Sequence, residues 1–277
     1  MGWMLTCLLV MAQAEKPADD AAAKEQQRKW NEYYAKVAAD YEIKRGKEQA
    51  QKLELKPEPV LFWSNPIRPG ETNGSVFVWT YDGRAELVGT IFSHLVRGST
   101  DMKIVAHEFQ SLTREPLAGS RPGAPGTWSL AGEGIEPRPI PGAASPATTA
   151  AGRLSQMRNL AREFSATTNL EGVEQELRML PQPIHRNAKS VGDVLDGALF
   201  TFVTGTDPEL MLIIEARPTA GSDKPVWQYA AGRFTDLTLK LRHNGRELWT
   251  RVYGTTEKGR PDPYVCIRPE TIPKIMP

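Results

Sequence analysis

Cysteine is nearly absent from this chain of 277 residues, which has only Cys7 and Cys266. Cys7 lies in an apolar N-terminal segment, and Met4-Leu5-Thr6 before it does not fit the small-residue pattern of a lipidation site. If that segment is removed, Cys266 is the one remaining thiol and no internal disulfide can form. A chain of this length can bury enough apolar surface to fold without one. We therefore expect its stability to rest on a hydrophobic core.

An excess of basic charge is also lacking. The chain has 34 Lys and Arg against 33 Asp and Glu, a net charge of +1, and no basic stripe stands out. Nucleic-acid binding proteins usually show one of these two features, so we expect no nucleic-acid partner. Apolar runs of about 20 residues, the length needed to cross a bilayer, are missing too. We therefore expect no transmembrane span.

The first fourteen residues, MGWMLTCLLVMAQA, form a short apolar segment that ends in a small-x-small sequence, Ala12-Gln13-Ala14. The charged sequence EKPADD follows at once. This order is typical of a secretory signal peptide, although no Lys or Arg precedes the apolar run. A start codon assigned too late would explain that departure. We expect residues 1–14 to be removed and the mature protein to be periplasmic or extracellular.

Residues 15–56 are rich in charge and in helix formers, and they predict one helix over most of 20–53. Acid-to-lysine pairs spaced four apart, such as Glu25-Lys29, support it. Its apolar stripe consists of Trp30, Tyr34, Val37 and Tyr41. The stripe allows two interpretations: it docks on the protein's own body, or it mediates self-association or contact with a protein partner.

Strand patterns dominate the remainder, residues 57–277, which we take as one β-rich domain. Two hairpins are predicted, at 75–94 and 198–216, and each is followed by a strand that carries aromatic residues, at 103–112 and 226–234. Proline and glycine crowd residues 115–150, which predicts a long loop without regular structure. A helix is predicted over about 150–166. The fold class is therefore α+β: a mainly antiparallel sandwich or open barrel with a long N-terminal helix and one internal helix.

The two hairpins resemble each other, because residues 76–93 align with 199–216 without a gap. The identical pairs are Phe77 and Phe200, Glu86 and Glu209, Leu87 and Leu210, and Ile91 and Ile214. Either the hairpins share only an apolar alternation, or an internal duplication builds two related β-meanders. In both cases we expect the paired Phe and Ile side chains to be buried. Duplication further requires the following strands to join their hairpins on the same side.

Four phrases in this region carry a family resemblance: FWSNPIRPG, HEFQSLT, LRMLPQPIHR and DGALFTFVTGTDPELMLIIEAR. Together they resemble a family of uncharacterised exported proteins of planctomycete bacteria, over most of residues 60–250. The resemblance implies export. It implies no activity, cofactor or site residue.

Sequence motifs for catalysis are lacking. His107-Glu108 is not part of an H-E-x-x-H zinc motif, and a strand would point these two side chains to opposite faces. No G-x-S-x-G elbow and no phosphate-binding loop occurs. We therefore predict no catalytic residue, metal or cofactor. The alternative is an exported hydrolase whose site is not visible as a motif, with His107 and Glu108 as its candidates.

Candidate binding residues are aromatic or basic. Trp79 and Trp227 would stack on flat ligands, and Arg158, Arg162 and Arg217 would bind anions. Each has an ordinary alternative, a core position for the tryptophans and a solvated surface for the arginines. We favour an exported, non-catalytic binding or structural protein of the cell envelope with an unknown ligand.

Overall fold

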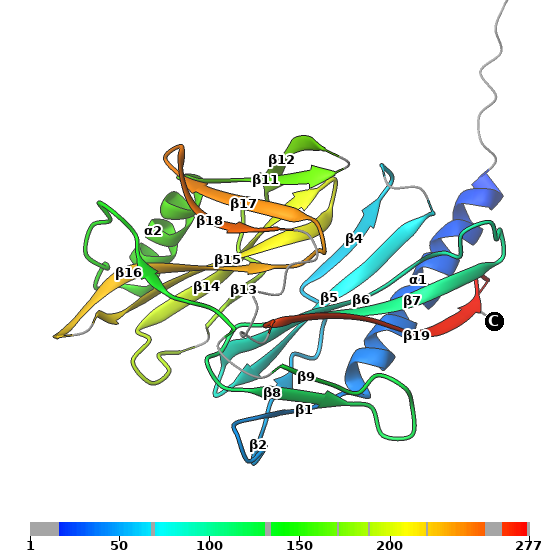
Figure 1. The fold of residues 1–277 in the computed structure, drawn as a ribbon, viewed down its shortest axis with the longest axis horizontal. Helices are drawn as coiled ribbons and strands as arrows, with labels where there is room; N and C mark the ends of the chain where they lie inside the picture. The colour runs from blue at the N-terminus through cyan, green and yellow to red at the C-terminus, as the bar shows by residue number, and fades with distance from the viewer. Residues whose placement is uncertain are drawn as a thin grey trace, which may run out of the picture.

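The computed structural model describes residues 17–67, 70–130, 134–170, 172–187, 189–219, 221–252 and 262–275. In these ranges the chain forms two helices and nineteen strands, and all strand pairings are antiparallel. This confirms the predicted α+β class (Figure 1). Neither helix is long and apolar enough to span a membrane. The predicted signal peptide lies outside the described residues.

The N-terminal helix is shorter than predicted. Helix α1 (Pro17–Ala39) ends well before residue 53, and three short strands follow: β1 (Glu42–Arg45), β2 (Gln51–Lys52) and β3 (Glu54–Leu55). Gly46 and Gln49, at φ of 87° and 52°, reverse the chain between β1 and β2. The acid-to-lysine pairs after residue 39 did not prevent this, because each is worth only about 0.2–0.5 kcal/mol and tertiary pairing outweighs it.

The aromatic stripe of α1 is buried in the protein's own core. Trp30, Tyr34, Val37 and Tyr41 are all at most 6% exposed. Tyr34 Oη lies 2.6 Å from Ser93 Oγ, and Tyr41 Oη lies 2.7 Å from His107 Nδ1, so both rings are fixed to the sheet. These four side chains therefore offer no surface to a partner, and we do not pursue the self-association hypothesis.

The rest of the first half of the chain is a β-meander flanked by short strands. Its elements are β4 (Leu61–Asn65), β5 (Thr72–Tyr81), β6 (Arg84–Leu95), β7 (Met102–Ser111), β8 (Leu117–Ser120), β9 (Trp128–Leu130) and β10 (Arg138–Pro139). Strands β8, β9 and β10 lie within 115–150, so the prediction of a loop without regular structure was wrong there. Proline and glycine only shorten these strands, since β8 still pairs with β1 and β9.

The second half has a corresponding order of elements, with the single strand β12 in the place of β2 and β3. These are α2 (Ala150–Arg162), β11 (Phe164–Leu170), β12 (Val173–Met179), β13 (His185–Arg186), β14 (Asp196–Thr204), β15 (Asp207–Thr219), β16 (Ser222–Arg233), β17 (Thr238–His243), β18 (Arg246–Arg251) and β19 (Tyr264–Pro273). Thr149 caps α2, its side chain accepting a hydrogen bond from the Gly152 amide.

The two predicted hairpins are β5–β6 and β14–β15, and their registers coincide. Trp79 pairs with Leu87 and the aligned Phe202 pairs with Leu210. In both hairpins the register shifts immediately after this aromatic residue. The third strands β7 and β16 each pair with the second strand of their hairpin, as duplication requires. The predicted inward positions are also confirmed, because Phe77, Phe200, Ile91 and Ile214 are at most 2% exposed.

The similarity extends far beyond the hairpins. Before each hairpin stands a Pro-x-Pro segment, KPEPV at 56–60 and LPQPI at 180–184. The amides of Val60 and Ile184 donate to the carbonyls of Val76 and Leu199, which are aligned residues. The buried face of α1 also aligns with that of α2 at a constant offset of 123 residues: Tyr34 with Met157, Val37 with Leu160, and Ala38 with Ala161. The same offset aligns the buried residues that follow the two helices, Tyr41 and Phe164.

We conclude that the chain is an internal duplication of an α-helix followed by antiparallel strands. The first repeat runs from α1 to β10 and the second from α2 to β19. The last strand of each repeat pairs with the other repeat: β10 pairs with β16, and β19 pairs with β7 (Figure 1). This reciprocal exchange ties the repeats together without a disulfide.

Three hydrophobic cores follow from this arrangement. Each helix packs on its own curled sheet, around Phe77 and Trp79 in the first repeat and around Phe200 and Phe202 in the second. The third core lies between the two sheets. It contains the side chains on the face of each sheet that points away from the helix of that repeat. It includes Val76, Val78 and Val88 of the first repeat and Leu199, Met211 and Ile213 of the second. The boundary between the repeats is therefore an apolar interface with two open ends.

Candidate functional site

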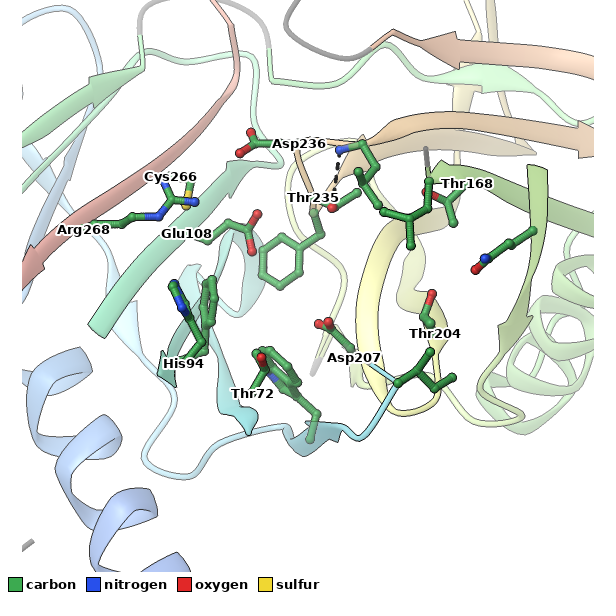
Figure 2. A pocket seen from close by; sticks show the side chains of 17 residues that line it. Thr72, His94, Glu108, Thr168, Thr204, Asp207, Thr235, Asp236, Cys266 and Arg268 are labelled. Atoms are coloured by element: carbon green, nitrogen blue, oxygen red, sulfur yellow. Dashed lines mark hydrogen bonds between the residues drawn. The ribbon is translucent and has the colours of Figure 1, made fainter. Parts of the chain in front are cut away.

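One end of this interface contains a pocket of about 440 Å³, which we name the Glu108 pocket (Figure 2). Residues of both repeats line it. Thr72, His94 and Glu108 come from the first repeat, Thr168, Asp207 and Thr235 from the second, and Cys266 and Arg268 from the exchanged strand β19. Its volume lies within the range of about 300–1,000 Å³ that is usual for small-molecule sites.

Aromatic rings form one part of the wall. Trp63 and Phe92 lie with their ring centroids 5.6 Å apart, and Phe234 comes from the other repeat. Trp63 Nε1 donates to Thr90 Oγ1 at 3.0 Å, which fixes the orientation of the indole. Phe234 is 1% exposed and joins the core between the sheets. The pocket thus has a rigid apolar surface that it does not need to assemble on binding.

Glu108 is the central polar group. It lies on β7, is 7% exposed, and accepts a hydrogen bond from the Tyr264 hydroxyl of β19. Burial raises the pKa of Glu108 well above its ordinary value, and the negative charges of Asp207, Glu209 and Asp236 act in the same direction. Its side chain is therefore a neutral carboxylic acid over a pH range in which an exposed glutamate is ionised.

His107 is not part of this site. As expected for neighbouring residues of a strand, its side chain points to the other face, where its ring nitrogen meets Tyr41 at 2.7 Å. Burial, with the positive charge of Arg121, lowers the pKa of His107 to about 4. His107 and Glu108 therefore form no acid-base pair, and the hydrolase candidates are separated by the sheet.

Cys266 lies beside Glu108 on the paired strand, on the same face. Burial, together with the nearby Glu108 carboxyl, raises the pKa of the Cys266 thiol to about 12. A thiol in this state is a poor nucleophile, because only the thiolate attacks. No group of three or more His, Cys, Asp or Glu side chains in the described ranges is placed to hold a metal ion.

One histidine does meet a carboxylate, but for a structural reason. His243 Nε2 lies 2.8 Å from Glu163 Oε2 at the end of α2, with its ring 4.8 Å from that of Phe164. In the first repeat the corresponding residues are Arg121, Asp40 and Tyr41. Arg121 makes an ion pair with Asp40 at 3.9 Å and stacks on the Tyr41 ring at 5.8 Å. A basic residue thus meets an acidic residue and an aromatic ring at the end of both helices. We therefore assign this contact a role in folding and not in catalysis.

The opposite end of the interface contains the corresponding pocket, of about 410 Å³, which we name the Arg84 pocket. Eight aligned positions line both pockets. The pairs, with the residue of the Arg84 pocket given first, are Arg45 and Thr168, Tyr81 and Thr204, Arg84 and Asp207, Leu112 and Phe234, Thr113 and Thr235, Arg114 and Asp236, Glu115 and Leu237, and Arg217 and His94. The duplication has therefore produced two related sites whose chemistry differs.

The wall of the Arg84 pocket contains an ion pair that joins the two repeats. Arg84 donates to Glu86 of its own repeat at 2.7 Å and to Glu215 of the other repeat at 2.8 Å and 3.3 Å. In the Glu108 pocket, Asp207 accepts a hydrogen bond from Asn65 at 2.9 Å, and Phe92 takes the place of Glu215. The Glu108 pocket is thus aromatic where its counterpart is charged.

The other candidates from the sequence lie elsewhere. Trp79 and Trp227 are each 1% exposed in the cores of the two repeats, so they cannot stack on a ligand. Arg217 lines the Arg84 pocket and pairs with Asp193 at 2.9 Å. Arg158 and Arg162 are on α2, away from both pockets, where Arg162 donates to Asn159.

Most residues of the Glu108 pocket were missed because they are scattered along the chain and belong to no recognisable motif. A longer alignment of the repeats would have found part of them. Thr113-Arg114-Glu115 and Thr235-Asp236-Leu237 follow aligned third strands, so the divergence from Arg114 to Asp236 is visible in the sequence.

No family model, no curated protein and no solved structure matches this chain. The function must therefore be argued from the chemistry of the site.

Proposed function

We propose that the protein is an exported, non-catalytic binding protein of the cell envelope that takes a small ligand into the Glu108 pocket. The observation that carries this proposal is the divergence of the two corresponding pockets. The two have similar volumes, but one is lined by the Arg84 ion pairs, and the other has an aromatic wall and a buried carboxylic acid. Ligand sites are commonly found at such boundaries between structural units.

Binding is favoured over catalysis by the state of the groups in the pocket. Burial raises the pKa values of Glu108 and of the Cys266 thiol, which favours their protonated forms, and His94 Nδ1 lies 3.1 Å from the Leu95 carbonyl. None of them forms a nucleophile and base pair with another described residue, which is the geometry that acyl or glycosyl transfer would require. A neutral acid and rigid rings are well suited to holding a ligand without reaction.

Export is supported by the apolar segment of residues 1–14 and its small-x-small end. The fold is compatible with an oxidising compartment, since the mature chain would have one thiol and needs no disulfide. The resemblance to exported planctomycete proteins points in the same direction.

The proposal is tested by a thermal-shift screen of small molecules on the protein beginning at Glu15. A ligand at 100 times its dissociation constant should stabilise the native state by about 2.7 kcal/mol. The deciding variant is Thr204→Tyr, which places in the Glu108 pocket the residue that the first repeat has at the aligned position. We expect it to weaken binding, because the larger side chain occupies part of the pocket and replaces a threonine hydroxyl of its wall.

Tyr81→Thr, the reverse exchange in the Arg84 pocket, is the matched control and should bind as the wild type does. A ligand that binds equally well to Thr204→Tyr and to the wild type would contradict the proposal, because its site would lie elsewhere.

A hydrolase remains the second candidate, and one observation favours it. The raised pKa of Glu108 is what a general acid needs, and Asp207 and Asp236 line the same pocket. Prolonged incubation of each screened ligand with the protein, followed by mass spectrometry, separates the two functions. The binding proposal predicts that every ligand is recovered unchanged. Cleavage that is lost in Glu108→Gln would establish the hydrolase instead.

A further inference from the structure

Polar groups that both donate and accept hydrogen bonds surround the aromatic wall of the Glu108 pocket. They are the hydroxyls of Thr72, Thr168, Thr204 and Thr235 and the amide of Gln175. They belong to five separate segments of both repeats, so they approach a ligand from different directions (Figure 2). We propose that the ligand is a neutral polyhydroxylated compound of the carbohydrate class. This inference rests on the proposed function and specifies it.

The charges around the pocket favour a neutral ligand. Asp207 accepts a hydrogen bond from Asn65, and Asp236 lies 3.6 Å from the guanidinium of Arg233. Arg268 contributes a positive charge to the same wall. A ligand with a formal charge would meet both signs here and would lose its hydration, which is costly without a dedicated partner. Hydroxyl groups carry no such penalty.

The hydrogen-bonding capacity also fits hydroxyls. Thr168 is 2% exposed, and its Oγ1 has no hydrogen-bond partner among the described residues. Buried polar atoms are rarely left unpaired, so a donor or acceptor from a bound molecule is the natural complement. Glu108 adds a carboxylic acid that donates as well as accepts. A ligand with several hydroxyls can satisfy both residues at once.

The aromatic wall supplies the apolar half of recognition. Trp63 and the partly exposed Phe92 present ring surface to the pocket, and the Trp63 indole is held in place through Thr90. A sugar ring has one face made mainly of C–H groups, which can cover such rings while its hydroxyls point to the polar groups at the edge. Burial of this face contributes about 25 cal/mol for each Å² removed from water.

The test uses the protein beginning at Glu15, with isothermal titration calorimetry and tryptophan fluorescence as readouts. The probes are glucose, galactose, mannose, N-acetylglucosamine and myo-inositol, with choline and citrate as charged comparators. We expect saturable binding of at least one neutral probe. Thr235→Val should then raise its dissociation constant about tenfold, the effect of losing one hydrogen bond of roughly 1.4 kcal/mol.

Thr113→Val is the matched control. Thr113 and Thr235 are aligned, are 5% and 6% exposed, and accept equivalent bonds from the amides of Glu115 and Leu237. Any effect of the lost hydroxyl on folding should therefore be alike, while only Thr235→Val should weaken binding.

Two outcomes would overturn the inference. Binding of choline or citrate without any neutral probe would refute the carbohydrate class and leave the proposed function standing. Equal weakening by Thr113→Val and Thr235→Val would refute this pocket as the carbohydrate site. If neither these probes nor any molecule of the wider screen binds, the proposed function fails together with the inference.

Discussion

Arg84 and Asp207 occupy the same position in the two repeats, each at the start of the second strand of a hairpin. Arg84 pairs with Glu86 of its own repeat and with Glu215 of the other, whereas Asp207 accepts a bond from Asn65 beside an aromatic wall. The two ends of the interface thus differ in charge although the backbone register is the same. Ion pairs fasten the repeats at one end, and aromatic rings line the other.

The fastening role predicts a large effect of Arg84→Met on stability. The variant leaves Glu86 and Glu215 buried without their closest cation, although Arg45 and Arg217 stay within 3.8 Å and 3.6 Å of them. We expect the free energy of unfolding to fall by about 3 kcal/mol, toward the lower end of what breaking a buried pair costs. Urea denaturation followed by circular dichroism measures it.

Arg138→Met is the control for this experiment. Arg138 pairs with Glu136 at the surface, where its side chain is 50% exposed, and exposed pairs contribute at most about 1 kcal/mol. Equal losses in the two variants would show that Arg84 does not hold the repeats together.

The two cores predict matched losses from aligned substitutions. Phe77 and Phe200 are 2% and 0% exposed, so truncation of either to Ala should cost about 3–5 kcal/mol. Phe62 is 54% exposed, and Phe62→Ala should change stability by less than about 0.5 kcal/mol. Chemical denaturation measures the free energy of unfolding of the three variants and the wild type. A loss confined to one repeat would argue against equivalent packing in the duplicated sheets.

Stability should depend on pH through Glu108. Its folded pKa is raised above the unfolded value of 4.5, so the native state retains a proton that the unfolded chain releases. The associated stabilisation is fully present below pH 4.5 and is lost as the pH rises through the folded pKa. Glu108→Gln, which is neutral at every pH, should therefore gain stability relative to the wild type as the pH increases.

Unfolding free energies measured from pH 5 to pH 9 test this prediction, with Glu136→Gln as the exposed control. Curves for Glu108→Gln and the wild type that stay parallel would show that Glu108 is ionised in the native protein. The neutral donor assigned to the pocket would then be excluded.

Export predicts a defined N-terminus. Mass spectrometry of the protein from its native cells should find Glu15 as the first residue, because cleavage after Ala12-Gln13-Ala14 removes the apolar segment. Recovery of the intact chain beginning at Met1 would refute the export hypothesis. The ligand-binding proposal does not depend on this result.

Much of the fold could be read from the sequence. The hairpins, their aromatic positions and the third strands follow from period-two patterns and the Asp82-Gly83 turn, whose two residues take φ of 52° and 88°. The end of α1 could not be predicted, because the charged residues in 40–53 favour a helix. The burial of Tyr41, Ile43 and Leu53 in the core outweighs that preference. Local propensity is a weak guide where tertiary burial decides.

The site was much harder to predict than the fold. Glu108 was named as a candidate, but its partner Tyr264 was not. Tyr264 lies on β19, a strand of the other repeat that is distant in sequence and pairs with β7. Trp79 and Trp227 were predicted to stack on a ligand because indole rings can do so, but both are buried in the cores of the repeats. A pocket between repeats depends on how the two repeats pack together. Local sequence patterns, such as strand alternation, do not indicate that packing.

The most direct test of the ligand-binding account is a crystal structure of the protein with the best molecule from the screen. We predict density in the Glu108 pocket, with the ligand's apolar face against Trp63 and Phe92 and a polar atom within hydrogen-bond distance of Glu108. A ligand found in the Arg84 pocket or on the outer surface, with the Glu108 pocket holding only solvent, would contradict the account.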